Sequence, residues 1–266
     1  MKDNTPLGDR MKDYEAVTRA VLPRRTHTLL RVDIRAAHTY LRGAQRPFDD
    51  QFMAAMDAVA EALCTEITGS VFAYTQSDEI SVLYTDFATP TTQPWFGGIL
   101  AKQTSMAAAL ATAVLNEQRP GKRALFDARV FTIPDPVEVA NYFLWRQRDA
   151  VRNSISMAAQ AHFSHKRLHG VNSGSMQELL WSEAGINWNE YPDGCKRGRL
   201  VTRHSRERTI EYVDRRTGQP SATTAVRSWW RATAAPHFTT APDGWLAQTI
   251  PAMPTLTPAQ TEKAAA

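Results

Sequence analysis

The stretch VFAYTQSDEISVLYT, residues 71–85, decides the fold. Two short runs rich in β-branched and aromatic residues flank the polar tetrapeptide QSDE, and this pattern predicts a β-hairpin. Outward from the hairpin, apolar spacing and turn residues predict further elements on both sides. These are a strand at 28–34, a helix at 49–67, a helix at 99–116, a strand at 125–133, a long helix at 137–163 and a shorter helix at 176–182.

This order of elements predicts an α+β fold, because helices alternate with strands while one strand pair is a hairpin. A ferredoxin-like βαββαβ core, the palm of nucleotide polymerases and cyclases, has this order. We expect a mostly antiparallel sheet with helices packed on one face, plus a C-terminal extension. The predicted divisions are a catalytic core at 1–135, a helical segment at 136–205 and a basic extension at 206–266.

Two strands are predicted near the start of this C-terminal part, at 200–202 and 209–213, and its last stretch, 252–266, is expected to be frayed. Three tryptophans in the extension suggest that it packs onto the body of the protein. They are Trp229, Trp230 and Trp245.

The amino-acid composition excludes several classes of protein. With 266 residues, 43% hydrophobic and 22% charged, the chain is typical of an ordinary globular protein and not of a disordered or collagen-like one. We expect no transmembrane helix and no secretory signal, since the N-terminus is polar. Two cysteines are too few for a disulfide framework or a four-thiolate zinc site, and Cys64 falls among core positions. The cytoplasm is therefore the expected compartment.

Charge is distributed unevenly along the chain. Residues 51–100 contain six acids and no Lys or Arg, whereas residues 196–231 contain ten basic residues and three acids, a net charge of +7. An acidic centre beside a basic arm is typical of a metal site next to a polyanion site. An ordinary Arg-rich surface is the alternative.

Three carboxylates are the candidate metal ligands. Asp33 lies near the end of the first strand, and Asp78 with Glu79 lies in the hairpin. Neighbouring strands would bring all three to one edge, where such a cluster is costly without a cation. One or two Mg²⁺ ions would fit and would support phosphoryl transfer. Alternatively, the acids form an ordinary polar turn and a strand end.

Several motifs together resemble the tRNA(His) guanylyltransferase family, in particular its bacterial and archaeal guanylyltransferase-like branch of 3′–5′ polymerases. The resemblance covers about residues 10–205. The motifs are RVDIRAAHTYLRG (31–43), AYTQSDEISVLY (73–84), AKQTSMAAALATA (101–113), FDARVF (126–131), NYFLWRQRDAVRNSI (141–155) and GINWN (185–189).

The resemblance implies that Asp33, Asp78 and Glu79 bind two Mg²⁺ ions together with the backbone carbonyl of Ile34. Ile34 stands where the family usually has glycine, and Ala36 or Ala37 replaces a phenylalanine, so nucleotide preference is left open. The implied reaction has two steps. The RNA 5′-monophosphate is first adenylylated by ATP, and the 3′-hydroxyl of GTP or another NTP then displaces AMP.

Six further residues are expected to contact the nucleotide or its triphosphate. They are Arg35, His38, Ser77, Lys102, Ser105 and Arg129. Lys102 and Ser105 share a helical face, although an exposed lysine in an Ala-rich helix often serves only solubility. Arg129 shares a strand face with Asp127 and is expected to pair with it.

A second set is expected to bind RNA or to support the site. Arg146, Asp149 and Asn153 recur at helical spacing and predict an internal polar network. The other members are Arg152, Asn187, Lys196 and Arg197.

The predicted partners are the 5′ end of tRNA and nucleoside triphosphates, and the resemblance implies a dimer of dimers, a homotetramer. Two alternatives stay open. One is a nucleotide cyclase acting on free NTPs, although its Gly-Gly-Asp/Glu-Glu-Phe signature is absent. The other is a non-catalytic RNA-binding protein with the same fold, which would gain little from three acids facing RNA.

Overall fold

A computed structural model of the chain describes residues 5–216, 218–239 and 244–254. Its strands are β1 (His27–Ile34), β2 (Ser70–Gln76), β3 (Glu79–Thr85), β4 (Phe126–Ile133), β5 (Arg199–Val213) and β6 (Pro220–Ala234). Its helices are α1 (Pro6–Ala16), α2 (Ala37–Tyr40), α3 (Asp50–Glu66), α4 (Leu100–Gln118), α5 (Pro136–His162), α6 (His165–Leu168), α7 (Ser173–Ala184), α8 (Asp193–Arg197) and α9 (Trp245–Thr249), with short 3₁₀ turns η1 (Trp95–Gly98) and η2 (Trp188–Glu190).

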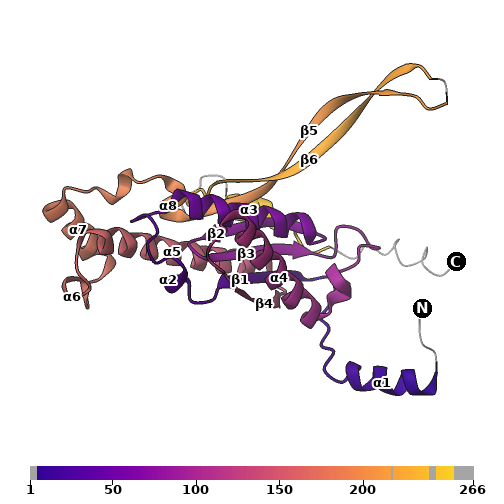
Figure 1. Cartoon of the computed structure of the whole chain (residues 1–266), viewed down its shortest axis with the longest axis horizontal. Coiled ribbons are helices and arrows are strands. Elements are labelled where there is room, and N and C mark those ends of the chain that lie inside the picture. Colours follow the sequence, from indigo (N-terminus) through magenta and orange to yellow (C-terminus); the bar gives the residue numbers. More distant parts are fainter. Residues whose placement is uncertain (1–4, 217, 240–243, 255–266) are drawn as a thin grey trace.

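One six-stranded sheet in the order β4-β1-β3-β2-β5-β6 organises the molecule (Figure 1). All of its pairings are antiparallel. Its first four strands have the ferredoxin-like order, so the predicted α+β class and palm-like core are confirmed. The predicted hairpin is β2–β3, joined by the two residues Ser77 and Asp78.

Helices cover both faces of this sheet, which corrects the expectation of a single covered face. Leu30 and Val32 of β1 pack with α3 and α4, whereas Leu29 packs with α5 on the opposite side. All seven residues of β3 are buried. A strand that is apolar on both faces must be covered on both faces, and the adjacent apolar pairs Leu29–Leu30 of β1 and Val82–Leu83 of β3 carried that signal.

Local sequence explains where the covering helices α3 and α5 begin. The Asp49 carboxylate accepts a hydrogen bond from the Phe52 amide at the start of α3. Asp135 does the same for Val137 at the start of α5, where Pro136 occupies the first turn. An N-terminal cap of this kind stabilises a helix by about 1 kcal/mol. The predicted division at 135/136 coincides with the start of α5, whereas 205/206 falls within β5.

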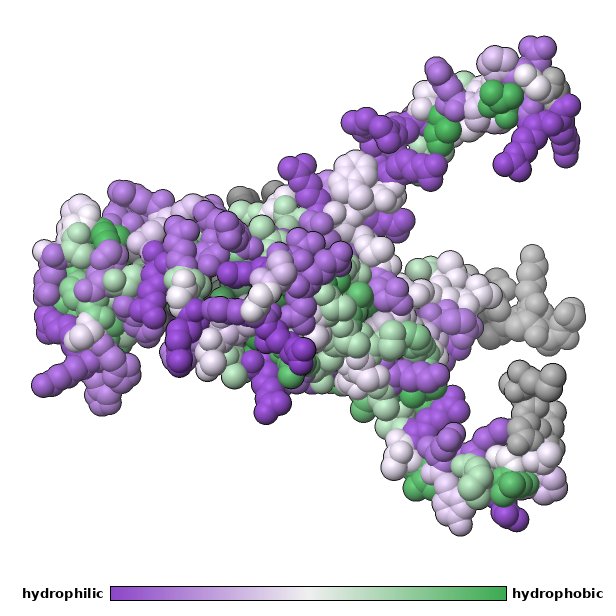
Figure 2. Space-filling model, in the orientation of Figure 1, coloured by the Kyte–Doolittle hydropathy of each residue, from purple (hydrophilic) through white to green (hydrophobic). Residues whose placement is uncertain are grey.

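The C-terminal extension only partly packs onto the body. Trp245 packs against Phe72 and Phe238, and Trp230 lies partly buried beside the α3 core. Trp229, however, is exposed and stacks on His204 within β5–β6. Beyond its buried base this strand pair, here called the arm, stands clear of the body (Figures 1 and 2). The predicted frayed stretch lies mostly outside the described residues.

Helix α1 also stands apart from the rest of the molecule (Figure 1). None of its residues is buried, although Leu7, Met11 and Tyr14 form an apolar stripe along it. Across the described part of the chain, no helix has the length and apolar character needed to cross a membrane.

Candidate active site

Four polar residues form one row across the sheet on the face covered by α5. Asp33 lies directly opposite Asp127 of β4 on one side and opposite Glu79 of β3 on the other. Glu79 in turn lies opposite Gln76 of β2. Residues directly opposite each other in antiparallel strands point to the same face. The sheet register therefore gathers three carboxylates from three strands, as expected for Asp33 and Glu79.

The hairpin turn adds Asp78 to this row. Ser77 adopts a left-handed conformation with φ of 46°, which is uncommon for a residue with a side chain. The carbonyl of Asp78 accepts a hydrogen bond from the Ile34 amide at 3.3 Å, which ties the turn to the end of β1. The strained turn and this bond hold the Asp78 backbone beside Asp33.

The electrostatics of the row favour a bound cation. Burial, and then the carboxylates of Asp78, Asp127 and Glu79, raise the pKa of Asp33 to about 6. In the described structure neither Asp33 nor Asp78 makes an ion pair through its side chain. Two crowded, unpaired carboxylates are the oxygen donors that a hard cation such as Mg²⁺ prefers. The donor set therefore fits the expected metal.

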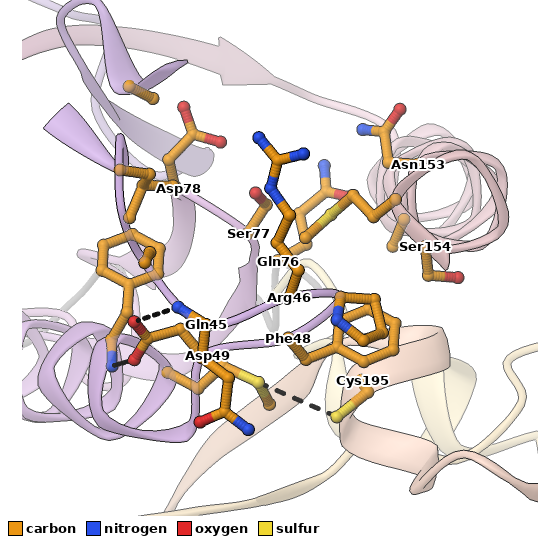
Figure 3. A pocket seen from close by; sticks show the side chains of 18 of the residues that line it. Gln45, Arg46, Phe48, Asp49, Gln76, Ser77, Asp78, Asn153, Ser154 and Cys195 are labelled. Atoms are coloured by element: carbon orange, nitrogen blue, oxygen red, sulfur yellow. Dashed lines mark hydrogen bonds between the residues drawn. The ribbon is translucent and has the colours of Figure 1, made fainter. Parts of the chain in front are cut away.

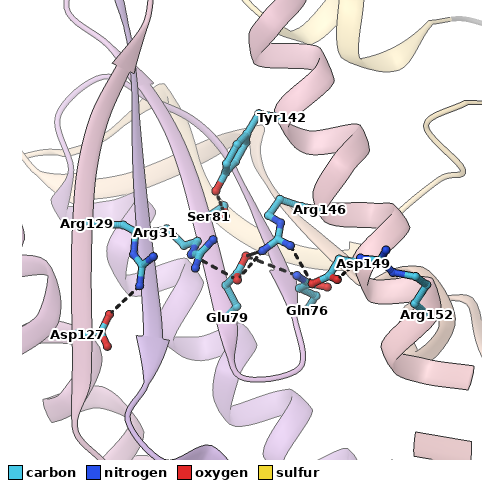
Figure 4. Close-up of polar contacts among 10 residues, drawn as sticks. All are labelled: Arg31, Gln76, Glu79, Ser81, Asp127, Arg129, Tyr142, Arg146, Asp149 and Arg152. Atoms are coloured by element: carbon cyan, nitrogen blue, oxygen red, sulfur yellow. Dashed lines mark hydrogen bonds and ion pairs between the residues drawn. The ribbon is translucent and has the colours of Figure 1, made fainter. Parts of the chain in front are cut away.

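Glu79 differs from the other two predicted ligands because arginines already hold its carboxylate (Figure 4). Arg146 donates to both of its oxygens, at 2.9 and 3.2 Å, and Arg31 lies 3.4 Å away. Within the described ranges, no group of three or more His, Cys, Asp or Glu side chains is arranged to hold a metal ion. Glu79 is thus an ion-pair partner in this arrangement, and Asp33 and Asp78 are the free carboxylates.

The predicted polar network on α5 is present in part. Arg146 bonds Asp149 at 2.8 Å as well as Glu79, and Arg152 bonds Asp149 at 2.6 Å. Arg146 is 5% exposed and also lies over the Trp145 ring. Asn153 is not joined to this network. The network fixes α5 against the carboxylate row, because removing one partner of a buried ion pair is costly.

A cavity of about 400 Å³ opens beside Asp78 (Figure 3). Its walls come from the segment 37–49, the hairpin turn, α5 and the region around α8. One end is apolar or sulfur-bearing, with Phe48, Met53 and Cys195, and Arg46 reaches between Asp78 and Asn153 in the view of Figure 3. A volume of this size suits a nucleotide-sized ligand.

The loop that forms one wall of the cavity is held from behind. Lys122 donates to the carbonyls of Tyr40 and Arg42, at 3.1 and 2.6 Å. The guanidinium of Arg119 lies over the Tyr40 ring and pairs with Asp49 at 3.6 Å. These contacts position the wall before any ligand enters.

The structure brings some predicted nucleotide-binding residues together and leaves others apart. His38 and Ser77 line the cavity, and Arg35 is exposed just after β1. Arg129 pairs with Asp127 at 3.6 Å, as expected from their shared face.

Lys102 and Ser105 are exposed at the opposite end of the sheet. Their neighbour Gln103 bonds Tyr84, which pairs with Thr28, five residues before Asp33 along β1. At about 3.3 Å per residue this is roughly 17 Å from the carboxylates. Within one chain they therefore do not join the carboxylate site.

The remaining predicted residues either line the cavity or have structural partners. Asn153 lines the cavity. Asn187 caps η2, and Arg197 pairs with Asp193. Lys196 is 6% exposed and donates to the carbonyl of Asn189. Lys196 and Arg197 thus hold the region around α8 together, which is a supporting role.

Sequence reasoning missed several residues of the site. Strand register would have added Asp127 and Gln76 to the row, since they lie directly opposite Asp33 and Glu79, and Arg31 beside it, since it lies two residues before Asp33 on the same face of β1. The cavity residues Arg46 and Cys195 lacked such a signal, because they come from irregular segments far apart in the sequence.

The two faces of the arm carry different side chains. On the face that continues from α5, Arg206 lies opposite Arg227, and the next pair toward the body is His204 with Trp229, stacked at 6.0 Å. The other face has Glu207 opposite Val226. Arginines next to a stacked aromatic pair, of which Trp229 is exposed, are typical of a nucleic-acid surface.

Comparison with known proteins agrees with these features. The family model described as tRNAHis guanylyltransferase matches residues 8–134. A bacterial tRNA(His) guanylyltransferase-like protein solved with ATP is 38% identical, with a TM-score of 0.79, over 92% of this chain and 99% of that chain. A similar structure solved with GTP is 36% identical, with a TM-score of 0.75 and the same coverage.

A more distant relative is the tRNA(His) guanylyltransferase of Saccharomyces cerevisiae. It is 28% identical over 204 residues, which are 69% of this chain and 84% of the yeast protein. The members named in these comparisons are nucleotidyltransferases. From its sheet, its carboxylate row and these likenesses, the chain belongs to the tRNA(His) guanylyltransferase family.

Proposed function

We propose that this protein adds nucleotides to the 5′ end of tRNA, or of a 5′-truncated tRNA, in the 3′–5′ direction. The observation that carries the proposal is the pair of free carboxylates, Asp33 and Asp78, beside a nucleotide-sized cavity. The 38% identity to a protein solved with ATP supports it. ATP and GTP or another NTP would be the substrates.

Asp33 and Asp78, with the backbone carbonyl of Ile34, would hold Mg²⁺. Bound there, the metal would supply charge stabilisation for the phosphates and acidify the attacking hydroxyl. Arg46 and the Ser77 hydroxyl would bind the triphosphate of the nucleotide in the cavity. Glu79 would keep Arg31 and Arg146 directed at the row, so that their positive charge faces the phosphates.

The reaction would proceed in two phosphoryl transfers. An RNA 5′-phosphate oxygen attacks the α-phosphorus of ATP, and pyrophosphate leaves. The 3′-hydroxyl of the incoming NTP then attacks the RNA phosphorus, its proton is lost, and AMP leaves. Preorganised positive charge around the phosphates lowers the barrier of both transfers.

The RNA would lie along the basic face of the arm. This face points the same way as the carboxylate row, because Leu200 at its base packs with α5. Contacts of arginine with phosphate would make binding depend steeply on salt.

The assembly and the compartment are also proposals. The exposed apolar stripe of α1 supports an oligomer, for which we propose the dimer of dimers. The scarcity of cysteine supports the cytoplasm.

Labelled GTP incorporation onto a 5′-monophosphorylated, 5′-truncated tRNA, with ATP and Mg²⁺, tests the proposal. We expect growth at the 5′ end with wild type and with Glu66→Ala, an exposed control, and none with Asp78→Ala. Retained RNA binding without growth would instead favour a non-catalytic binder. Cyclic products from free NTPs, without RNA, would favour a cyclase.

A further inference from the structure

Gln76 is a buried residue of the cavity to which the reaction outlined above gives no role. It ends β2 directly before the strained Ser77, and the residue is 4% exposed. It lines the cavity near Ser77 and Asn153 (Figure 3). It also lies opposite Glu79, so it belongs to the row of polar residues beside Asp33.

The two ends of the Gln76 amide have different surroundings. Its Nε2 donates to Oε1 of Glu79 at 3.5 Å. An ion-paired carboxylate only accepts hydrogen bonds, so the nitrogen must face Glu79 and the oxygen must face away. No donor in the described part of the chain reaches that oxygen, Oε1. A buried carbonyl oxygen without a donor is costly and rare in folded proteins.

The chemistry of a nucleotide limits which group could satisfy this oxygen. Phosphate oxygens accept hydrogen bonds and cannot donate one. The donors of a nucleoside triphosphate are its ribose hydroxyls and the amino and ring N–H groups of its base. Because Gln76 is adjacent to Ser77 and Asp78, where the phosphates would lie, the nearest donor would be on the sugar. The base would extend toward Phe48, Met53 and Cys195.

We propose that Gln76 is a specificity-determining residue for the sugar of the nucleotide bound in the cavity. Its Oε1 accepts a hydrogen bond from a ribose hydroxyl, and Glu79 holds the amide in the orientation that presents this oxygen. The inference rests on the proposed function, because it takes the phosphates to lie at Ser77 and Asp78.

Equilibrium binding by calorimetry tests it without requiring turnover. The full-length protein with Mg²⁺ is titrated with ATP, 2′-deoxy-ATP and 3′-deoxy-ATP. We expect wild type to bind one deoxy analogue about tenfold more weakly than ATP, as for the loss of one hydrogen bond to a buried acceptor. The analogue that loses affinity identifies the hydroxyl.

Two variants test whether Gln76 causes the difference in affinity between ATP and the deoxy analogue. Gln76→Leu has a similar shape without the amide, and we expect it to bind ATP and the weak analogue equally. Its melting temperature without ligand should not fall, since an unsatisfied acceptor is removed. Gln177→Leu, on α7 and outside the cavity lining, should discriminate as wild type does.

The outcomes separate the inference from the proposed function. Equal wild-type affinity for all three nucleotides, or discrimination that persists in Gln76→Leu, would overturn the inference and leave nucleotide binding intact. Wild type that binds no ATP would refute the proposed function itself. If Gln76→Leu fails to fold, Gln76→Met takes its place. The titrations of wild type with ATP and the two deoxy analogues still decide whether the protein recognises a ribose hydroxyl.

Discussion

Replacing Asp33 with asparagine should stabilise the metal-free protein, although it removes a proposed catalytic group. The Asp33 carboxyl lies opposite two other acids and near Asp78, with no ion-pair partner among the described residues. Burial and these carboxylates raise its pKa from 3.8 to about 6. The charged form is therefore less stable in the folded protein than in the unfolded chain.

The size of the effect follows from the shift. One pKa unit corresponds to 1.36 kcal/mol, so a change from 3.8 to about 6 would give ~3 kcal/mol if fully expressed. The carboxyl is only partly buried, and solvent screening reduces this to about 1–2 kcal/mol. For a chain of this size, we expect the Asn variant to melt roughly 3–6 °C higher.

The pH dependence has a defined sign. A carboxyl whose pKa is raised on folding costs stability as pH rises through the folded value, and the cost is complete above it. The advantage of Asp33→Asn should therefore be full at pH 8 and shrink between pH 6 and pH 4. Melting curves at each pH, with EDTA and with Mg²⁺, measure this. Magnesium should raise the melting temperature of wild type far more than that of the variant.

A matched control compares Asp33, which has no ion-pair partner in the described structure, with a buried carboxylate that is hydrogen-bonded. Asp86 is 6% exposed and accepts hydrogen bonds from the Arg25 amide and the Arg24 guanidinium. Asp86→Asn should lower the melting temperature, because hydrogen bonds to a charged group are worth about 1.5–3 kcal/mol. If Asp33→Asn without metal at pH 8 is no more stable than wild type, the carboxylate row is not strained and our account of it is wrong.

Three further predictions concern the surroundings of the site. Arg146→Met leaves Glu79 buried without its closest partner and should cost about 3–5 kcal/mol in urea unfolding; a loss below 1 kcal/mol would contradict the ion-pair network. Replacing Arg206 and Arg227 together by Ala should lower the slope of log affinity against log salt by about 1.5 for tRNA, and an unchanged slope would separate the arm from RNA. Burial raises the pKa of the Cys195 thiol, so N-ethylmaleimide should modify this thiol faster at pH 9 than at pH 7. ATP bound in the cavity should slow the modification. If ATP does not slow it, the nucleotide binds elsewhere.

The core of the fold could be predicted from sequence because its signals are local. The QSDE tip between two apolar runs predicts the β2–β3 hairpin, and the spacing of α3 predicts its buried stripe. The burial of both faces of the sheet was missed although β1 and β3 signalled it, because the sequence pattern of α5 does not indicate which face that helix covers. The alternating exposed residues of β5 and β6 gave too weak an apolar signal to show a 15-residue pairing.

The candidate site could be predicted in part, for a similar reason. Asp33, Asp78 and Glu79 sit in strand and turn positions that the βαββαβ order brings together. The pairing of Glu79 with Arg146 depends on how a helix 67 residues later crosses the sheet. The cavity combines an irregular loop with α5 and α8, and no periodicity encodes such a combination.

The arm also divides the sheet into regions of unequal local stability. At its base, Val201 and Ala232 are packed against the α3 core, so strand register there is fixed by burial. Beyond Ser205 the two strands pair only with each other and nearly all their side chains face solvent. The outer backbone amides should therefore exchange with deuterium through opening of the tip alone, while those near Val201 should exchange only when the sheet unfolds. One continuous strand pair would thus fold as two cooperative units, and the outer unit can be ordered by what it binds.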